Sequence, residues 1–156
     1  MQRELLQKLG EETIYSAKGH FKACDLRRNL VTITIWSCAV LNVVGIIGLG
    51  GYWDKSFPII GLFGTIALLI WNEGEGKDYR NNHKQAGEAY LAVHKEIREL
   101  FFRDQVTPED LESINKKVRK LDKSEKPEIP HLARKWAQKA IQKYNETDNW
   151  FLDEHK

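Results

Sequence analysis

The stretch Leu30–Trp53, LVTITIWSCAVLNVVGIIGLGGYW, decides the fold because none of its 24 residues is charged. At about 1.5 Å per residue, a helix of this length crosses the roughly 30 Å of hydrocarbon in a bilayer. A second uncharged run of 17 residues, Ser56–Asn72 (SFPIIGLFGTIALLIWN), lies at the short end of the spanning range. Only Asp54 and Lys55 separate the two runs. The sequence therefore predicts a transmembrane helical hairpin over residues 30–72.

The remaining sequence is strongly polar and excludes several protein classes. Of the 46 formal charges, 24 basic and 22 acidic, 44 lie outside residues 30–72. A hydrophobic content of 42% is too high for a fully disordered chain, and two cysteines are too few for a disulfide scaffold. A net charge of +2 gives no reason to expect bulk nucleic-acid binding. The alternative to a membrane hairpin is a buried hairpin in a soluble all-α domain, whose helices normally keep a polar stripe.

Basic residues flank the two runs and predict their orientation. Arg27 and Arg28 precede the first run, and Lys77, Arg80 and Lys84 follow the second. The tip between the runs has a single basic residue, Lys55. By the positive-inside rule, we expect a multi-pass membrane protein with both termini in the cytoplasm.

Small and polar residues recur at helical spacing inside both runs. They are Thr34, Cys38, Asn42, Gly45 and Gly48 in the first run, and Gly61 and Thr65 in the second. One interpretation is close helix packing, which small residues permit. The other is that Asn42 and its face line a pore in an oligomer, because a polar residue at mid-membrane needs a partner or water. Both interpretations stay open.

Apolar residues alternate at steps of four and three on both sides of the hairpin, a spacing typical of packed helices. After the hairpin they are Tyr79, His83, Ala86, Tyr90, Val93, Ile97 and Leu100, and before it Gly10, Ile14, Ala17, Phe21 and Cys24. We predict an all-α membrane protein whose two long helices, over about residues 11–52 and 57–103, extend into a cytoplasmic helical bundle. Gly74 and Gly76 are the predicted hinge at the membrane surface.

Two shorter helices are predicted in the C-terminal region. Thr107–Asp110 (TPED) is typical of a helix N-terminus, and the prolines of Ser124–Pro130 separate this helix from a last one over about residues 131–144. Their apolar stripes are Leu111, Ile114, Val118 and Leu121 in the first, and Leu132, Trp136, Ala140 and Ile141 in the second. The predicted organisation is a cytoplasmic helix at 1–29, the hairpin at 30–72, a cytoplasmic extension at 73–103 and a C-terminal helical cytoplasmic region at 104–156.

Basic residues on these two helices form the candidate ligand site. A phosphate-bearing nucleotide needs Arg or Lys for its phosphates and an aromatic ring for its base. The first candidates are Arg134, Lys135, Trp136 and Lys139, and the second are Lys116 and Lys120. The alternative is a solvated, charge-balanced helix face near an anionic membrane.

No catalytic or nucleotide-binding motif is visible in the sequence, so we expect neither enzyme activity nor a cofactor. His20 and Cys24 are four residues apart on a predicted helix and could share a metal ion with a ligand from another helix. Ordinary contacts between helices explain them better, and no metal site is predicted.

A further pattern covers about residues 10–145. A polar helix leads into a glycine-rich span, a short tip, a second span and a long helix containing His83–Tyr90 (HKQAGEAY) and Ile97–Leu100 (IREL). A proline-bearing segment, Lys126–Pro130 (KPEIP), then precedes the final helix. In this plan the chain resembles the SLATT family, two-transmembrane effectors of bacterial conflict systems.

The resemblance implies a pore-forming or membrane-disrupting effector of the bacterial inner membrane that acts in abortive antiphage defence. The plan is also similar to that of membrane effectors of type III CRISPR systems, which implies gating by a nucleotide second messenger such as cyclic oligoadenylate. The cytoplasmic region or a partner would sense this signal. Because two spans alone cannot enclose water, we expect a homo-oligomer, a tetramer or larger, in the lipid bilayer. The alternative function is a non-pore membrane anchor or adaptor that recruits a cytoplasmic partner.

Overall fold

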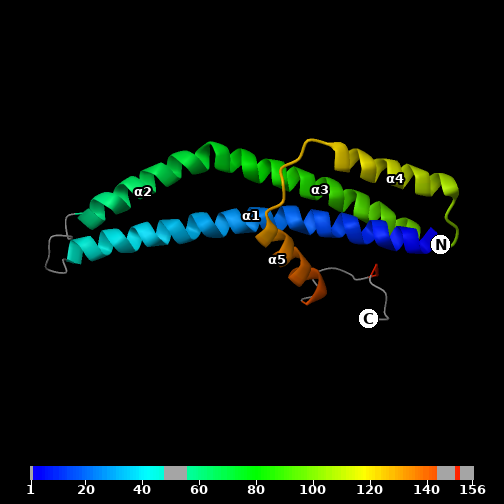
Figure 1. Cartoon of the computed structure of the whole chain (residues 1–156), viewed down its shortest axis with the longest axis horizontal. Helices are drawn as coiled ribbons and strands as arrows, with labels where there is room; N and C mark the ends of the chain where they lie inside the picture. The colour runs from blue at the N-terminus through cyan, green and yellow to red at the C-terminus, as the bar shows by residue number, and fades with distance from the viewer. Residues whose placement is uncertain (1, 48–55, 144–149, 152–156) are drawn as a thin grey trace. The chain divides into compact units, whose positions relative to one another are not determined.

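The computed structural model describes residues 2–47, 56–143 and 150–151, and these residues form five helices and no strand (Figure 1). The helices are α1 (Gln2–Ile47), α2 (Ser56–Glu73), α3 (Glu75–Phe101), α4 (Pro108–Lys123) and α5 (His131–Gln142). The all-α prediction is confirmed for this part of the chain. Contacts divide the described residues into a helical unit, from residues 1–24 and 82–156, and a hairpin unit, from residues 25–81. α1 and α3 contribute residues to both units.

The long helices differ from the prediction at their ends. α1 begins at Gln2, not near residue 11, because Leu6 and Leu9 extend its buried stripe. Its predicted end at residue 52 lies outside the described residues. The single helix predicted over residues 57–103 is two helices, because Gly74 stands in a turn between α2 and α3. Glycine is among the poorest helix formers, so a break at this position is cheap.

The main core of the helical unit joins three helices. Its buried members are Leu6 and Leu9 of α1, Val93, Ile97 and Leu100 of α3, and Ile114 and Val118 of α4. Fully burying one such side chain stabilises a fold by about 1.5–3 kcal/mol. The apolar seam that the sequence predicts in α3 therefore packs within the chain. Close approach is essential at Gly87, where a Cβ atom would lie 2.9 Å from Cε1 of Phe21.

The N-terminus of α4 carries the predicted cap. The Thr107 hydroxyl accepts a hydrogen bond from the Asp110 backbone N–H at 3.1 Å, and the Thr107 backbone N–H donates to Asp110 Oδ2 at 3.1 Å. Caps of this kind stabilise a helix by about 0.5–2 kcal/mol. The reciprocal pair explains why α4 begins at Pro108.

The buried face of α5 differs from the prediction. Leu132, expected on the apolar side, is 54% exposed, and Trp136 is only partly buried. Ala140 and Ile141 are buried as predicted, and Ala133 and Ala137 complete the face in place of Leu132 and Trp136. Small alanines let a helix approach its neighbours closely, so Ile141 reaches a second core cluster with Ile14 and Phe151. Phe151 is buried in this cluster, and Trp150 packs against it.

The hairpin unit brings the small-residue faces of α1 and α2 together. Cys38 is buried, and a Cβ atom at Gly61 would lie 2.9 Å from the Cys38 carbonyl oxygen and 2.7 Å from Asn42 Nδ2. A Cβ atom at Gly64 would lie 3.0 Å from Cys38 Sγ. These distances describe close helix–helix packing that larger residues would prevent.

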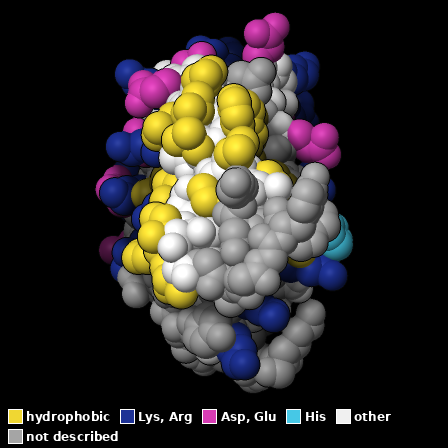
Figure 2. Space-filling view, turned by 90° about the vertical axis from the view of Figure 1, so that its left-hand side faces the viewer, with side chains coloured by type: hydrophobic (Ala, Val, Ile, Leu, Met, Phe, Trp, Pro, Cys, Tyr) yellow, Lys and Arg dark blue, Asp and Glu magenta, His cyan; other side chains and the backbone are white. Residues whose placement is uncertain are grey.

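Outside this contact, α1 and α2 leave large apolar side chains exposed. Both helices are long and apolar enough to cross a membrane, and only 6% of the most apolar stretch of each is buried. The most exposed of these side chains include Trp36, Ile46, Phe63 and Ile70. Figure 2, viewed from the side on which α1 ends and α2 begins, shows hydrophobic side chains grouped together on that face. A core helix of a soluble protein buries such residues.

We expect Gly61→Ala to loosen the contact between α1 and α2. The added methyl group would overlap the Cys38 carbonyl, which is backbone and cannot rotate away, and overpacking of this kind costs about 1–3 kcal/mol. In a Cys24→Ser background, the buried Cys38 thiol should then react faster with a membrane-permeant maleimide, as measured by mass spectrometry. Gly74→Ala is the matched control, because its Cβ atom would lie 3.7 Å from the nearest atom. Equal reaction rates in the two variants would contradict the packing role of Gly61.

Candidate functional site

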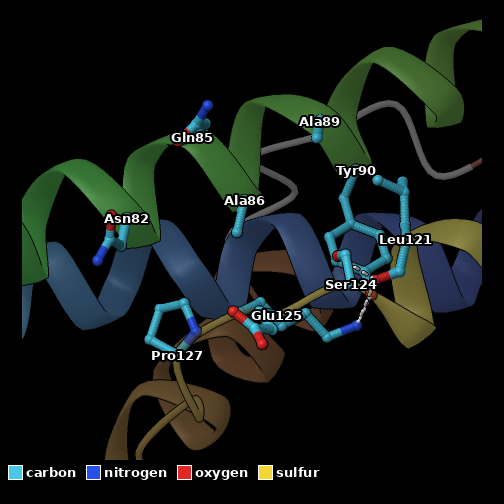
Figure 3. A pocket seen from close by; sticks show the side chains of 10 residues that line it. Asn82, Gln85, Ala86, Ala89, Tyr90, Leu121, Ser124, Glu125 and Pro127 are labelled. Carbon is cyan, nitrogen blue, oxygen red and sulfur yellow. Dashed lines mark hydrogen bonds between the residues drawn. The ribbon is translucent and has the colours of Figure 1, made fainter.

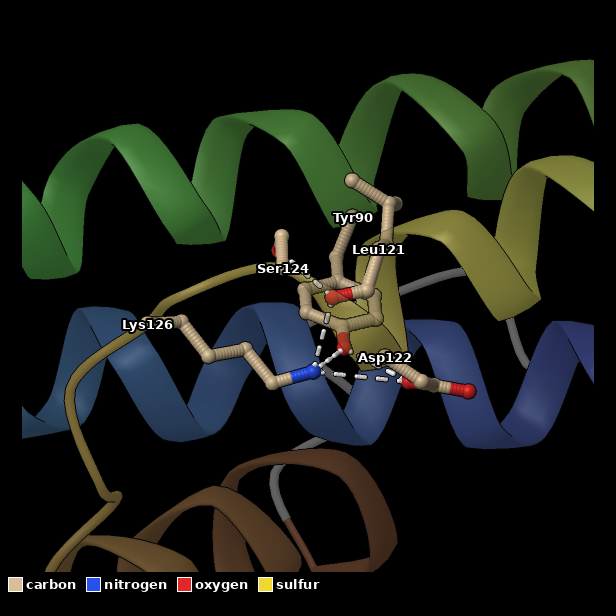
Figure 4. Close-up of polar contacts among 5 residues, drawn as sticks. All are labelled: Tyr90, Leu121, Asp122, Ser124 and Lys126. Atoms are coloured by element: carbon tan, nitrogen blue, oxygen red, sulfur yellow. Dashed lines mark hydrogen bonds and ion pairs between the residues drawn. The ribbon is translucent and has the colours of Figure 1, made fainter.

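A polar cluster in the helical unit joins α3, the end of α4 and the segment that follows it (Figure 4). The Tyr90 hydroxyl donates a hydrogen bond to Asp122 Oδ1 at 2.7 Å. Lys126 Nζ donates to the Tyr90 hydroxyl and to the Leu121 carbonyl oxygen, 3.0 Å away, and pairs with Asp122 at 3.5 Å. The last carbonyls of a helix have no partner inside the helix and need such donors. The cluster therefore holds the C-terminus of α4 against α3.

An open pocket of about 600 Å³ lies beside this cluster (Figure 3). Tyr90 and Lys126 form part of its wall. The other lining residues are Asn82, Gln85, Ala86, Ala89, Leu121, Ser124, Glu125 and Pro127. The Lys126 ammonium group already has three oxygen partners, so the pocket mainly offers amide and hydroxyl groups and the Glu125 carboxylate to a ligand. This chemistry suits a neutral polar molecule better than a phosphate.

Two buried histidines share a hydrogen bond next to Tyr90. Nδ1 of His20 on α1 lies 2.8 Å from Nδ1 of His83 on α3, and both residues are at most 1% exposed. The His20 ring also stacks on the Tyr90 ring, with 6.0 Å between the centroids. One Nδ1 must donate a proton and the other must accept it, so both atoms cannot carry a proton at once. The pair therefore requires at least one neutral imidazole.

Burial disfavours the charged form of these histidines. Burial, together with the positive potential of His83 and Lys126, lowers the pKa of His20 from 6.5 to about 4. Burial also lowers the pKa of His83. The same cause lowers the pKa of His94, although its Nδ1–H donates to the Gly10 carbonyl oxygen at 3.0 Å. Between about pH 4 and pH 6.5 the helical unit therefore keeps the His20 imidazole neutral, whereas in water it would be mostly protonated.

The predicted ligand residues are only partly brought together. Arg134 and Lys135 line a second pocket of about 680 Å³. Its other lining residues are Glu11, Tyr15, Ser16, Ile129, His131, Gln138 and Gln142, and thus include neither Trp136 nor Lys139. Arg134 Nε donates to the Ile129 carbonyl oxygen at 3.1 Å, and Arg134 Nη2 lies 3.7 Å from the exposed Glu128 carboxylate. Such an exposed ion pair is weak, so an anion can compete for Arg134.

Lys116 and Lys120 lie elsewhere. They line an open pocket of about 750 Å³, and all of its lining residues lie within Glu112–Ser124. This pocket therefore belongs to one helix and its C-cap. The two basic groups predicted from the sequence thus line separate pockets of the helical unit.

The predicted polar residues of the spans mostly satisfy their hydrogen bonds locally. Asn42 Nδ2 donates to the Cys38 carbonyl oxygen at 2.8 Å, and the Thr65 hydroxyl donates to the Gly61 carbonyl oxygen at 2.8 Å. These four residues lie at or beside the packing contact of the hairpin unit. Within one chain their arrangement is that of helix packing.

The other candidates in the hairpin unit are placed differently. Thr34 is exposed, and its hydroxyl donates to a carbonyl of its own helix at 2.9 Å. Gly45 is half-buried, and Gly48 lies outside the described residues. Of the two predicted hinge residues, Gly74 stands between α2 and α3, whereas Gly76 is buried in the first turn of α3.

One contact of the hairpin unit was missed by sequence reasoning. The Arg27 guanidinium carbon lies 3.8 Å from the ring centroid of Trp71 and 5.0 Å from that of Tyr79. Arg27 precedes the first uncharged run, and Trp71 ends the second, so an antiparallel hairpin could have indicated the pairing. Cation–π contacts of this type stabilise by about 0.5–2 kcal/mol.

Comparison with known proteins finds no counterpart: no family model, curated protein or solved structure matches the chain. The SLATT resemblance and its functional implications therefore stay predictions. Within the described residues, no three His, Cys, Asp or Glu side chains gather in a group that could hold a metal ion. His20 and Cys24, considered above, thus have no third ligand in that part of the chain.

Acid should destabilise the helical unit through His20. In the unfolded chain His20 binds a proton near pH 6.5, but in the folded chain only near pH 4. The stability that comes from neutral His20 is therefore fully present above pH 6.5 and is lost as the pH falls toward 4. One such proton changes the free energy of unfolding by at most about 1.4 kcal/mol per pH unit. His20→Asn should reduce this slope in urea unfolding followed by circular dichroism in detergent. The exposed His131→Asn is the control, and identical slopes in both variants would contradict the role of His20.

Proposed function

We propose that the chain is a pore-forming or membrane-disrupting effector of the bacterial inner membrane. In this proposal α1 and α2 span the bilayer with both termini in the cytoplasm, and four or more copies assemble. A nucleotide second messenger, sensed by the helical unit or by a partner, controls the assembly. The antiphage role is proposed from the SLATT resemblance.

The observation that carries the membrane part is the exposed apolar surface of the hairpin unit. Its packing contact uses small residues such as Gly61 and Gly64, which leaves side chains such as Trp36, Phe63 and Ile70 outside. Isolated apolar residues on a surface are ordinary, but a continuous surface of this kind indicates a membrane or other copies of the chain. Lipid would cover it without further protein.

The shared helices support a gating mechanism. α1 is an uninterrupted helix from Gln2 to Ile47, so it belongs to the helical unit at one end and to the hairpin unit at the other. A ligand that binds one packing of the helical unit more tightly shifts the population toward that packing. α1 and α3 are the elements through which this shift reaches the hairpin unit.

A non-pore membrane anchor is the second candidate, favoured by the hydrogen bond that Asn42 donates within its own helix. Its amide nitrogen already donates within α1, and its side chain packs on Gly61. A polar residue that is satisfied inside the hairpin does not need water from a pore. In this case the helical unit would recruit a partner to the membrane.

Leakage from vesicles separates the two candidates. Protein in lipid vesicles loaded with carboxyfluorescein should release the dye when cyclic di- to hexa-adenylates are added. If Asn42 also lines the open pore, Asn42→Leu should lower the release while native mass spectrometry shows the same oligomer. Leu62→Ile, at an exposed position of α2, is the control and should leak like the wild type. Insertion without leakage under every nucleotide would favour the anchor, and a purely monomeric protein would contradict the pore.

Ligand binding by the helical unit is expected to depend on Arg134. Each charge-assisted hydrogen bond to a phosphate contributes about 1.5–3 kcal/mol, so Arg134→Ala should weaken binding roughly tenfold or more. Calorimetric titration of the full chain in detergent with the same cyclic nucleotides measures this. Arg3→Ala, an exposed residue of α1, is the control. If Arg134→Ala binds the nucleotide with unchanged affinity, the binding site lies elsewhere in the chain or in a partner protein.

A further inference from the structure

Arg27 is held in a fixed geometry by three elements of the hairpin unit. It lies on α1, against the Trp71 ring at the end of α2 and the Tyr79 ring in α3. A Cβ atom at Gly76 would lie 3.1 Å from Arg27 Nη2, so glycine leaves more room for this approach than a larger residue would. The guanidinium group thus sits at the break between α2 and α3, with aromatic rings covering part of its surface.

The guanidinium group is short of hydrogen-bond acceptors. Nε and Nη2 of Arg27 are buried and have no hydrogen-bond partner among the described residues. The residue as a whole remains partly exposed, so part of Arg27 is still accessible from outside. A buried guanidinium N–H without an oxygen acceptor is costly, so a small movement of Arg27 that brings these donors to an anionic group would be favoured.

The position of Arg27 along the chain indicates the source of that anion. Arg27 lies three residues before the uncharged run that begins at Leu30, and Trp71 lies one residue before the other uncharged run ends at Asn72. Trp and Tyr side chains are enriched where hydrocarbon meets headgroups. If the hairpin spans a bilayer, Arg27 lies at the depth of the lipid phosphates.

We propose that Arg27, oriented by Trp71 and Tyr79, binds the phosphate of an anionic phospholipid headgroup. This inference rests on the proposed membrane insertion of α1 and α2. The planar guanidinium group presents parallel N–H donors that match two phosphate oxygens, whereas a lysine presents a point charge.

The net charge near the junction of α2 and α3 gives no general attraction for anionic lipids. The junction residues 25–28 and 73–80 contain four basic and four acidic side chains, and the nearby Arg28 is already paired with Asp25 at 3.2 Å. Their formal charges cancel. Preference for anionic lipid must therefore come from the geometry of Arg27, and charge alone should not preserve it.

The experiment uses the full chain in vesicles of phosphatidylglycerol and phosphatidylcholine mixed in equal amounts. After gentle detergent extraction, native mass spectrometry counts the lipids that stay bound. The wild type should retain phosphatidylglycerol over phosphatidylcholine, and both Arg27→Gln and Arg27→Lys should lower this ratio roughly tenfold. Arg28→Lys, a matched change at the exposed neighbouring arginine, should keep the ratio.

The outcomes separate this inference from the proposed function. Insertion is tested by flotation in a density gradient with vesicles of pure phosphatidylcholine. Arg27 variants whose fold is intact should float with these vesicles as the wild type does. Normal flotation with no lipid preference, or with Arg27→Lys equal to the wild type, overturns the lipid site and leaves the membrane proposal standing. Failure of the wild type to float overturns both. Displacement of phosphatidylglycerol by millimolar inorganic phosphate would show a site for the free anion instead.

Discussion

Apolar surface that water cannot favourably cover is the constraint on which the structure depends. α1 and α2 carry it on nearly every side, because their mutual contact uses glycine, cysteine and asparagine. Removing apolar surface from water is worth about 25 cal/mol per Å², so this much exposed surface needs lipid or further copies around it. α1 continues as a helix through the whole described part of the first run, so its backbone satisfies its own hydrogen bonds, as a hydrocarbon surrounding would require. The first break after the second run comes at Gly74, where the sequence becomes polar again.

The helical unit is held together by an apolar core and by buried polar contacts. It packs a conventional apolar core and also buries His20 and His83, and this burial lowers the pKa of both imidazoles. Their shared proton and the Tyr90–Asp122–Lys126 contacts link α1, α3 and α4 by directional bonds. Directional bonds specify one register between helices more sharply than apolar contacts do. Any signal that enters this unit therefore acts on a tightly specified packing.

The two units place opposite demands on polar residues. In the hairpin unit Asn42 and Thr65 donate to carbonyls of their own helices, which lowers the cost of carrying them into an apolar surrounding. Arg27 cannot be treated in the same way, because its charge and several donors exceed what nearby groups of the described chain accept. Aromatic rings cover the Arg27 guanidinium group in part, and its donors still lack a hydrogen-bond acceptor among the described residues. Small polar side chains of the hairpin unit therefore bond to the backbone of their own helix, whereas the larger, charged Arg27 needs a hydrogen-bond acceptor from outside the described chain.

The sequence by itself determined the helices, the uncharged runs, the cap at Thr107 and the buried seam of α3, because periodicity, charge and capping are local properties of the chain. It could not decide which face of α5 is buried, since Leu132 and Ala133 begin competing stripes and only close contact with neighbouring helices selects the smaller residues. It could not separate Lys116 and Lys120 from Arg134 and Lys135, which line different pockets although both pairs fit the same pattern. The His20–His83 bond and the Arg27–Trp71 contact join residues 63 and 44 positions apart. Only the tertiary structure decides such contacts, because they depend on the rotation and register of one helix against another.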